Sequence, residues 1–314
     1  MQLFQPRTTY KPFEYPQAFS YFQRQNQAHW LPTEVAMEAD ISDYRHKLSD
    51  AERALVDNVL RFFTQGDVAV NDNYNTQLIP AFPKPEIRMM LSSFAAMESV
   101  HVWAYSFLND SLGLPDSEYS AFLEYQSMRD KYDFVKSFGT GNMRELALNL
   151  AVFGAFMEGV SLFSSFAILM NFPRLGKLKG LGQIVTWSCR DEQLHSDGVC
   201  WLFRTLVGEN PSLLDNTLLV ELMAACDQMI HLEDAFIDTC FALGAVPGLK
   251  SEDVKAYIRN VANTRLEALQ LPKMYNVTNP LPWLAPMING KEHANFFEAR
   301  ATEYTKGAVI SDWE

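Results

Sequence analysis

Two short segments of the sequence place a glutamate three residues before a histidine: Glu98 with His101, and Glu192 with His195. Residues three apart on a helix share a face, so each segment presents one carboxylate and one imidazole to the same point. The chain has only six histidines, and these two lie in apolar stretches. One such segment is often an ordinary core histidine or a surface ion pair, whereas two of them predict a metal site.

Each segment also follows an upstream carboxylate. Asp67 precedes Glu98 by 31 residues, and Glu158 precedes Glu192 by 34 residues. Separations of this size suit two neighbouring antiparallel helices. Carboxylates with one imidazole per ion favour iron or manganese over zinc or copper, and such ions support redox chemistry. The sequence therefore predicts a helical bundle that holds two ions with six ligands: Asp67, Glu98, His101, Glu158, Glu192 and His195.

Glu158 gives the clearest physical reason for a metal. It lies in the apolar segment Ala155-Phe-Met-Glu-Gly-Val-Ser-Leu-Phe163. An unpaired carboxylate there would cost several kcal/mol or would have to take up a proton, and a bound cation removes that cost. Asp72 lies five residues after Asp67 and is the alternative to it. We prefer Asp67 because it continues the apolar helix face of Leu60 and Phe63.

Two other groups of acids and histidines look less like ligands. Asp43 and His46 lie in a polar stretch, and that pair has no second copy in the chain. His231, Glu233 and Asp234 are predicted to form a solvated helix face.

Helical patterns cover most of the chain, and alternating β patterns are scarce. We expect an all-α bundle with no internal domain boundary, made of an irregular N-terminal arm (1–30), a helical domain (31–290) and a flexible C-terminal tail (291–314). The helices are predicted at 49–74, 85–109, 117–137, 143–170, 180–207, 212–244 and 251–269.

Composition excludes several other classes of protein. The net charge is −12 and no cluster of Lys and Arg appears, which argues against a nucleic-acid partner. The four cysteines are scattered without metal or disulfide spacing, as in a reducing compartment. The apolar stretch 146–170 contains Asn149 and Glu158, so a core helix is favoured over a membrane span. With no signal peptide evident, a cytoplasmic protein is expected.

Tyr105 lies four residues after His101, on the same helix face. With this residue the sequence closely resembles the small, radical-generating beta subunit of class I ribonucleotide reductase, a member of the ferritin-like superfamily. The resemblance covers roughly residues 30–304. Its motifs are Phe62-Phe-Thr-Gln-Gly-Asp67, Met97-Glu-Ser-Val-His-Val-Trp-Ala-Tyr105, the Glu158 helix and Cys189-Arg-Asp-Glu-Gln-Leu-His195.

The resemblance implies a role for each matching residue. Asp67, Glu98 and His101 would hold one ion, and Glu158, Glu192 and His195 the other, with two iron ions expected and manganese as the alternative. Oxygen would react with the reduced ions, and Tyr105 would become a stable tyrosyl radical. Its pocket would be walled by Leu162, Phe166 and Ser188, although the family is usually apolar at the position of Ser188. A radical relay would use Trp30, Asp191 and the tail residue Tyr304.

The resemblance also implies partners. A large catalytic subunit would reduce ribonucleotides, and Val309–Glu314 could dock on it through Trp313. A homodimer is expected, and an activator protein or ferredoxin-like reductant could assist loading. The alternatives are another di-metal oxidase, such as a desaturase or a ligand-binding oxidase, and iron storage of the ferritin type. Tyr105 argues against storage and against the family variant with phenylalanine at that position, and the relay residues argue against the other oxidases.

Overall fold

The computed structural model describes residues 2–121 and 124–289, which are mostly helical and contain no β-strand. The all-α prediction is therefore confirmed. The α-helices are α1 (Pro16–Gln27), α2 (Glu38–His46), α3 (Asp50–Asn73), α4 (Ile79–Ala81), α5 (Pro85–Leu112), α6 (Glu118–Ala121), α7 (Gln126–Lys136), α8 (Met143–Leu150), α9 (Leu162–Arg174), α10 (Lys179–Glu209), α11 (Asn216–Cys240), α12 (Ser251–Ala268) and α13 (Leu284–Asn289). Two π-helical segments, η3 (Tyr74–Leu78) and η5 (Ala151–Ser161), and three short 3₁₀ turns, η1 (Gln2–Phe4), η2 (Pro32–Glu34) and η6 (Pro211–Leu213), complete the order.

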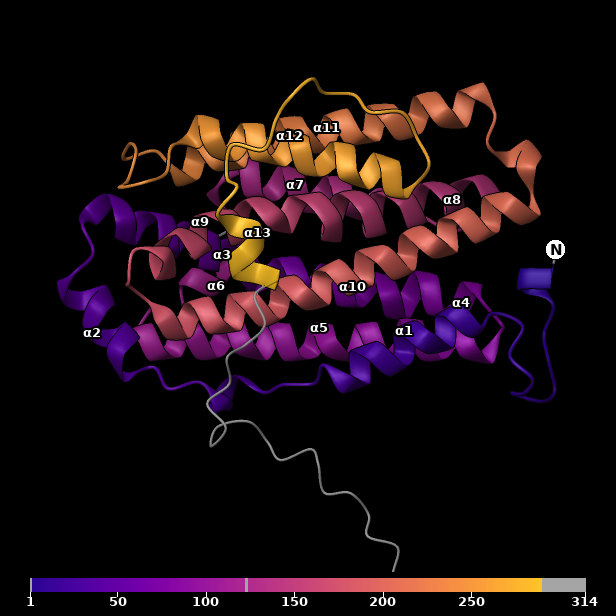
Figure 1. Cartoon of the computed structure of the whole chain (residues 1–314), viewed down its shortest axis with the longest axis horizontal. Coiled ribbons are helices and arrows are strands. Elements are labelled where there is room, and N and C mark those ends of the chain that lie inside the picture. Colours follow the sequence, from indigo (N-terminus) through magenta and orange to yellow (C-terminus); the bar gives the residue numbers. More distant parts are fainter. Residues whose placement is uncertain (1, 122–123, 290–314) are drawn as a thin grey trace, which may run out of the picture.

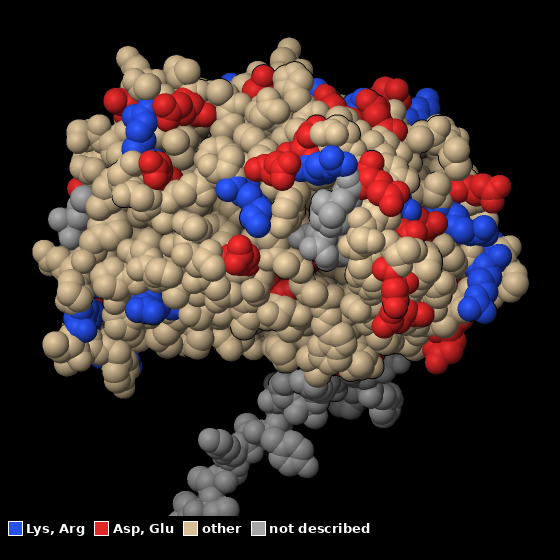
Figure 2. Space-filling model, turned by 180° about the vertical axis from the view of Figure 1, so that it is seen from behind, with Lys and Arg blue, Asp and Glu red and all other residues tan. Residues whose placement is uncertain are grey.

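Four long segments form the centre of the bundle and carry the predicted ligands. Helix α3 packs against α5, and η5 packs against α10. Helices α11 and α12 cover η5, while α1 runs along α5 and α10 (Figure 1). On the face seen in Figure 2, basic side chains lie beside acidic ones instead of gathering in a patch.

Local sequence signals set the ends of these helices as predicted. Ser49 and Glu52 form a capping box at the start of α3, with Glu52 Oε2 accepting from the Ser49 amide at 2.8 Å. Pro85 occupies the first turn of α5, where its missing N–H has no intrahelical partner to lose. Helix α5 ends at Gly113, which adopts the left-handed conformation with φ of 79°.

The long apolar stretch is a core helix, as predicted. Helical structure runs without a break over Met143–Arg174, which is long and apolar enough to cross a membrane, but 94% of its most apolar window is buried inside the bundle. Its middle part is the π-helical η5, where Gly159 lets α10 and α12 come close. A Cβ at Gly159 would lie 2.6 Å from Arg265 Nε and 2.7 Å from Ser196 Oγ. The wide turn and the small residue together place Glu158 inside the bundle.

Three expectations about secondary structure were wrong. The N-terminal arm is not irregular throughout, because α1 forms between Pro16 and Gln27 with Pro16 in its first turn. Its buried stripe is only Ala18, Tyr21 and Gln25, too polar and too short to show a clear helical period. The helix predicted at 117–137 is divided into α6 and α7, since Tyr125 is extended. The set of predicted helices, which ended at residue 269, was incomplete, because a final helix, α13, forms beyond it.

The predicted solvated face around residue 233 was also partly wrong. His231 is exposed, but Glu233 is fully buried. Glu233 Oε1 lies 2.5 Å from Lys131 Nζ of α7, and its other oxygen accepts from Ser164 Oγ at 2.5 Å. Lys131, 102 residues away in the sequence, therefore provides the opposite charge that allows this carboxylate to be buried. The boundaries at residues 30 and 290 stay predictions, and the tail 291–314 lies outside the described residues.

Candidate metal centre

The structure brings all six predicted ligands together between α3, α5, η5 and α10. None of their side chains is more than 1% exposed. One group offers ligand atoms of Glu98, Glu158, Glu192 and His195 that all lie within 4.8 Å of one another. A second group joins Asp67 and His101 to Glu98 within the same limit. Because Glu98 belongs to both groups, the two candidate ion positions share a carboxylate.

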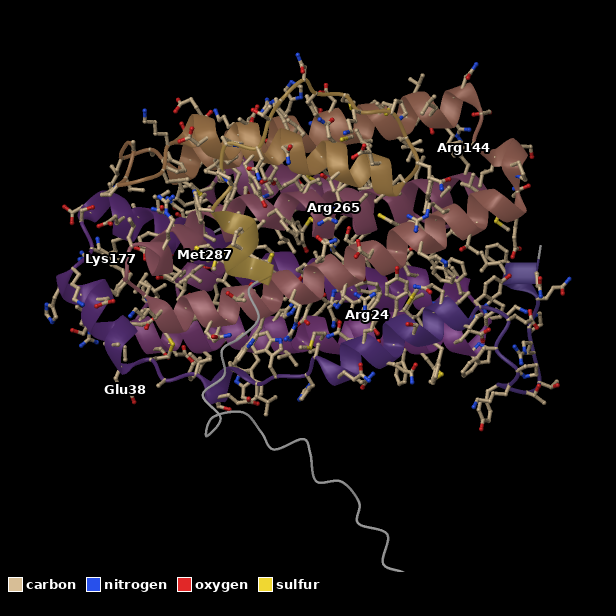
Figure 3. All side chains as sticks on the ribbon, viewed as in Figure 1. Arg24, Glu38, Arg144, Lys177, Arg265 and Met287 are labelled. Atoms are coloured by element: carbon tan, nitrogen blue, oxygen red, sulfur yellow. The ribbon has the colours of Figure 1, made fainter. Side chains whose placement is uncertain are left out.

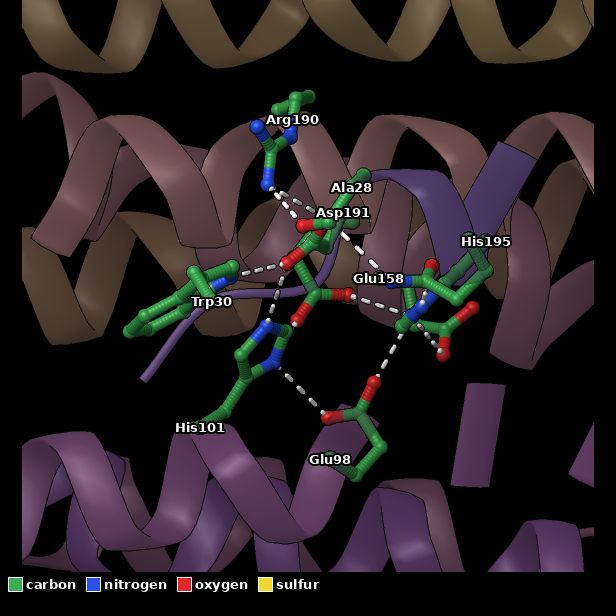
Figure 4. Close-up of polar contacts among 10 residues, drawn as sticks. Ala28, Trp30, Glu98, His101, Glu158, Arg190, Asp191 and His195 are labelled. Carbon is green, nitrogen blue, oxygen red and sulfur yellow. Dashed lines mark hydrogen bonds and ion pairs between the residues drawn. The ribbon is translucent and has the colours of Figure 1, made fainter. Parts of the chain in front are cut away.

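Both imidazoles turn Nδ1 toward the carboxylates (Figure 4). His195 Nδ1 lies 2.8 Å from Glu98 Oε1, and His101 Nδ1 lies 3.0 Å from Glu192 Oε1. Each histidine therefore meets the glutamate of the other Glu-x-x-His segment as well as its own. This crossed arrangement follows from the packing of α5 against α10, and it makes one compact cluster from two sequence motifs.

Several atoms of this cluster lack a hydrogen-bond partner among the described residues, although they are buried. Burying such atoms costs roughly 1–3 kcal/mol each for neutral groups and more for charged ones. Two cations would satisfy them, and oxygen-rich ligands with one imidazole each suit iron or manganese. The ligand residues present therefore fit a di-metal group. The atoms are both carboxylate oxygens of Asp67 and of Glu158, and Glu192 Oε2. Glu98 Oε1 and His195 Nδ1 belong to the same set, because they face each other at 2.8 Å without the geometry of a hydrogen bond.

The pKa values of the metal-free cluster reflect the burial of several carboxylates close together. Burial raises the pKa of Glu158 well above its usual range, and the charges of Glu192 and Glu98 add to this effect. Burial alone would also raise the pKa of Glu98, but the two histidines outweigh it and lower that pKa to about 2. Burial lowers the pKa of His195, yet contacts with Glu192 and Glu98 raise it to about 10. Protons therefore compensate the carboxylates when no metal is bound.

Metal binding is accordingly expected to release protons. His195 is protonated at neutral pH without metal, because its pKa of about 10 lies above that pH, and a ligating imidazole must be neutral. The affinity for Mn²⁺ should therefore rise between about pH 6 and about pH 8, roughly tenfold per pH unit for each proton released. Titration calorimetry in two buffers of different protonation enthalpy measures the number of protons released when the metal binds. Equal heats in both buffers would contradict the expectation.

A second layer of polar residues orients His101. Its Nε2 lies 3.4 Å from Asp191 Oδ2, and the same oxygen accepts a hydrogen bond from Trp30 Nε1 at 2.7 Å. The Trp30 ring also stacks on His101, with ring centroids 6.0 Å apart. Trp30 is 2% exposed and Asp191 is fully buried. The structure therefore connects Trp30 and Asp191, the relay residues that the resemblance implied, to the candidate ligand His101.

Gln25 on α1 completes this layer and was not predicted. Its Oε1 lies 2.9 Å from His195 Nε2, and its Nε2 donates to Asp191 Oδ1 at 3.4 Å. The Gln25 amide thus connects Nε2 of His195 to Asp191, which also contacts His101. Residues that surround the ligands of metal sites commonly orient the ligating histidines in this way. The only sequence signal was the spacing of Ala18, Tyr21 and Gln25, which share a helix face.

Tyr105 is buried beside the cluster. It is 2% exposed, and its ring stacks on Phe63 with centroids 4.2 Å apart. Burial, reinforced by the Asp67 charge, raises the pKa of Tyr105 well above its ordinary value. The predicted wall residues Leu162, Phe166 and Ser188 are all buried, whereas Phe63 was not predicted as a wall. Tyr304 lies outside the described residues.

A cavity of about 470 Å³ lies beside the second layer. Its wall includes Cys189 and Asp191 of α10, Arg24 of α1 and Arg265 of α12. Figure 3 labels the two arginines. None of the six predicted ligands lines it. Among the described residues, the cavity therefore reaches Asp191 without being lined by any candidate ligand.

Comparison with known proteins agrees with these features. Residues 7–280 match the family model of the ribonucleotide reductase small chain. The chain is 42% identical to a probable ribonucleoside-diphosphate reductase small subunit of Invertebrate iridescent virus 3, over all of this chain and 88% of that protein. Its fold is similar to the ribonucleotide reductase R2 subunit from Clostridium botulinum (TM-score 0.84, 20% identity, 90% and 91% of the two chains) and to the dimanganese(II)-NrdF of Streptococcus sanguinis (TM-score 0.80, 20% identity, 91% and 100%). The chain therefore belongs to the ribonucleotide reductase small-chain family.

Proposed function

We propose that this chain generates the radical of an aerobic class I ribonucleoside-diphosphate reductase. A small subunit of this family works with a large subunit, in which ribonucleotides are reduced to deoxyribonucleotides. The observation that carries the proposal is the position of Tyr105, buried beside six converging ligands and shielded by Phe63. We further propose a cytoplasmic homodimer, two iron ions or alternatively manganese, and an activator protein or ferredoxin-like reductant for loading.

The bound ions would supply one-electron oxidising power from molecular oxygen. Tyr105 would give up one electron to the oxidised site and the proton of its hydroxyl to a nearby carboxylate such as Asp67, whose charge lies close enough to raise the pKa of Tyr105. The radical would then stay on the Tyr105 ring. Phe63, which stacks on the Tyr105 ring, would keep water and reductants away from it, together with Phe166, which packs on Phe63. The resemblance adds Leu162 to this wall. This exclusion is the contribution of the protein to the lifetime of the radical.

The relay begins at a single carboxylate oxygen. Asp191 Oδ2 contacts His101 and accepts the Trp30 N–H, so an electron and a proton can move in step between the ligand and the indole. The remaining path to the large subunit is proposed from the resemblance. It would use Tyr304 and the tail 291–314, which lie outside the described residues.

Trp30→Phe is expected to separate radical formation from radical transfer. Phenylalanine keeps an aromatic ring against His101 but cannot donate to Asp191 and is much harder to oxidise. The Tyr105 radical should still form, while nucleoside-diphosphate reduction with a large subunit falls at least about a hundredfold. Turnover assays and electron paramagnetic resonance on the same sample measure both quantities.

A matched control is Trp201→Phe. Trp201 lies on α10 and is partly buried, whereas Trp30 is fully buried. Its ring contacts Tyr15 and Tyr21 instead of the metal cluster. This variant should keep both the radical and turnover. Full turnover in Trp30→Phe would refute the relay, and loss of turnover in both variants would indicate a general packing defect.

A further inference from the structure

Arg265 of α12 bonds to the residues that directly follow two of the predicted ligands. Its Nε donates to the carbonyl oxygen of Gly159 at 2.9 Å, and its Nη2 donates to Gln193 Oε1 at 2.9 Å. Gly159 follows Glu158 on η5. Gln193 follows Glu192 on α10. One guanidinium therefore connects the backbone next to one ligand with the side chain next to the other.

The Arg265 side chain has little freedom to move. It is 3% exposed, and its guanidinium lies 5.0 Å from the centroid of the Phe163 ring. A Cβ at Gly159 would lie 2.8 Å from Arg265 Cδ, so the glycine leaves the room that the arginine occupies. A guanidinium is planar and its N–H groups point in fixed directions. Its two bonds therefore set a distance between η5 and α10.

The carboxylate of Glu158 needs such support from outside. Both of its oxygens lack a hydrogen-bond partner among the described residues, so the backbone of η5 decides where this carboxylate lies. That backbone is π-helical, a conformation that is rare and occurs mostly as short segments at functional sites. Arg265 holds it one residue beyond the carboxylate.

We propose that Arg265 is a positioning residue for the second ion, the one expected between Glu158, Glu192 and His195. Arg265 holds the two glutamates at the spacing at which both can bind that ion. The inference rests on the proposed metal centre. Because the other ion has its ligands on α3 and α5, whereas Arg265 bonds to η5 and α10, the loss of Arg265 should weaken the second ion selectively.

The test titrates the metal-free full chain with Mn²⁺ and follows binding by calorimetry and electron paramagnetic resonance. In Arg265→Met, the second Mn²⁺ should bind about 10–100-fold more weakly, as on loss of other residues that orient metal ligands, while the first binds within about threefold of wild type. With two equivalents of Mn²⁺, the variant should show the hyperfine-resolved signal of single ions, whereas wild type shows a magnetically coupled pair.

Three further variants make the result specific. Arg265→Lys can reach only one of the two acceptors and should recover part of the lost affinity. Arg259→Met removes an arginine of the same helix that bonds to Asp234, and it should bind both ions like wild type. Gln193→Ala removes only one bond at a partly exposed position, so it tests the proposal even if Arg265→Met does not fold. Its second ion should bind at least about threefold more weakly.

A second measurement needs no metal. In the metal-free chain, the backbone amides of η5 should exchange hydrogen at least about tenfold faster in Arg265→Met than in Arg259→Met, because the π-helical turn has lost its support. Equal exchange in the two variants would overturn the proposal.

The binding data can overturn it independently. Wild-type affinity for the second ion in both Arg265→Met and Gln193→Ala would do so, and so would equal weakening of both ions, which indicates a general packing defect. Binding of fewer than two Mn²⁺ by wild type would instead contradict the proposed metal centre. The exchange of η5 would then decide alone whether Arg265 holds this segment.

Discussion

Tyr105→Phe is expected to abolish the tyrosyl radical and to reduce turnover at least about a thousandfold, without changing the number of bound ions. Tyr105 is not one of the six predicted ligands, which form the two ligand groups, so the metal site should load normally. Phenylalanine keeps the ring that stacks on Phe63 but lacks the hydroxyl that loses its proton on oxidation. Metal analysis, electron paramagnetic resonance and turnover with the large subunit measure the three effects.

A second buried tyrosine provides the matched control. Tyr74 is 1% exposed and packs edge-on against His195 with centroids 6.3 Å apart. Tyr74 is therefore as buried as Tyr105 and also lies next to the cluster. It lies near Glu158, whereas Tyr105 lies near Asp67. Tyr74→Phe should retain the radical. A signal that survives in Tyr105→Phe and disappears in Tyr74→Phe would place the radical on Tyr74 instead.

Lys131→Met is expected to lower the free energy of unfolding by about 3–5 kcal/mol. The variant leaves the fully buried Glu233 without its cation. It also removes the ammonium that lies over the rings of Phe62 and Phe236, at 3.7 and 4.0 Å from their centroids. Burial already raises the pKa of Glu233, and loss of Lys131 would raise it further. Urea denaturation followed by circular dichroism measures the change.

Two comparisons isolate the buried charge. The double variant Lys131→Met with Glu233→Gln should recover much of the lost stability, because no carboxylate is then left unpaired. Lys255→Met removes a more exposed ion pair with Asp238, and it should cost less than about 1 kcal/mol. A loss below about 1 kcal/mol in Lys131→Met would contradict the assignment of a buried charge pair.

The sequence predicted the ligands because their signals are local. Glu98 and His101 share a helix face by spacing alone, and Glu158 is conspicuous as a carboxylate in an apolar segment. The structure brings these residues together as the pattern indicated. The wide π-helical turn of η5 around Glu158 could not be foreseen, since the helical patterns were interpreted with the α-helical period.

Other features depend on partners far away in the chain. Gln25 meets His195 across 170 residues, and its helix shows too little apolar period to be detected. Glu233 was interpreted as solvated because its neighbours His231 and Asp234 are polar, yet Lys131 neutralises it in the core. Arg265 gave no signal in the sequence, because only the fold places it beside Gly159 and Gln193. The period of apolar residues along a helix identifies its buried face, but it does not identify the residues that this face contacts.

Radical formation requires the six predicted ligands to hold two ions beside a tyrosine that can be oxidised. The most direct test is to load the wild-type chain with iron(II) without oxygen, expose it to oxygen, and record metal content and the electron paramagnetic resonance spectrum. We predict about two ions per chain and a tyrosyl signal. Two bound ions with no tyrosyl signal, both for iron and for manganese supplied with an activator protein, would contradict the account.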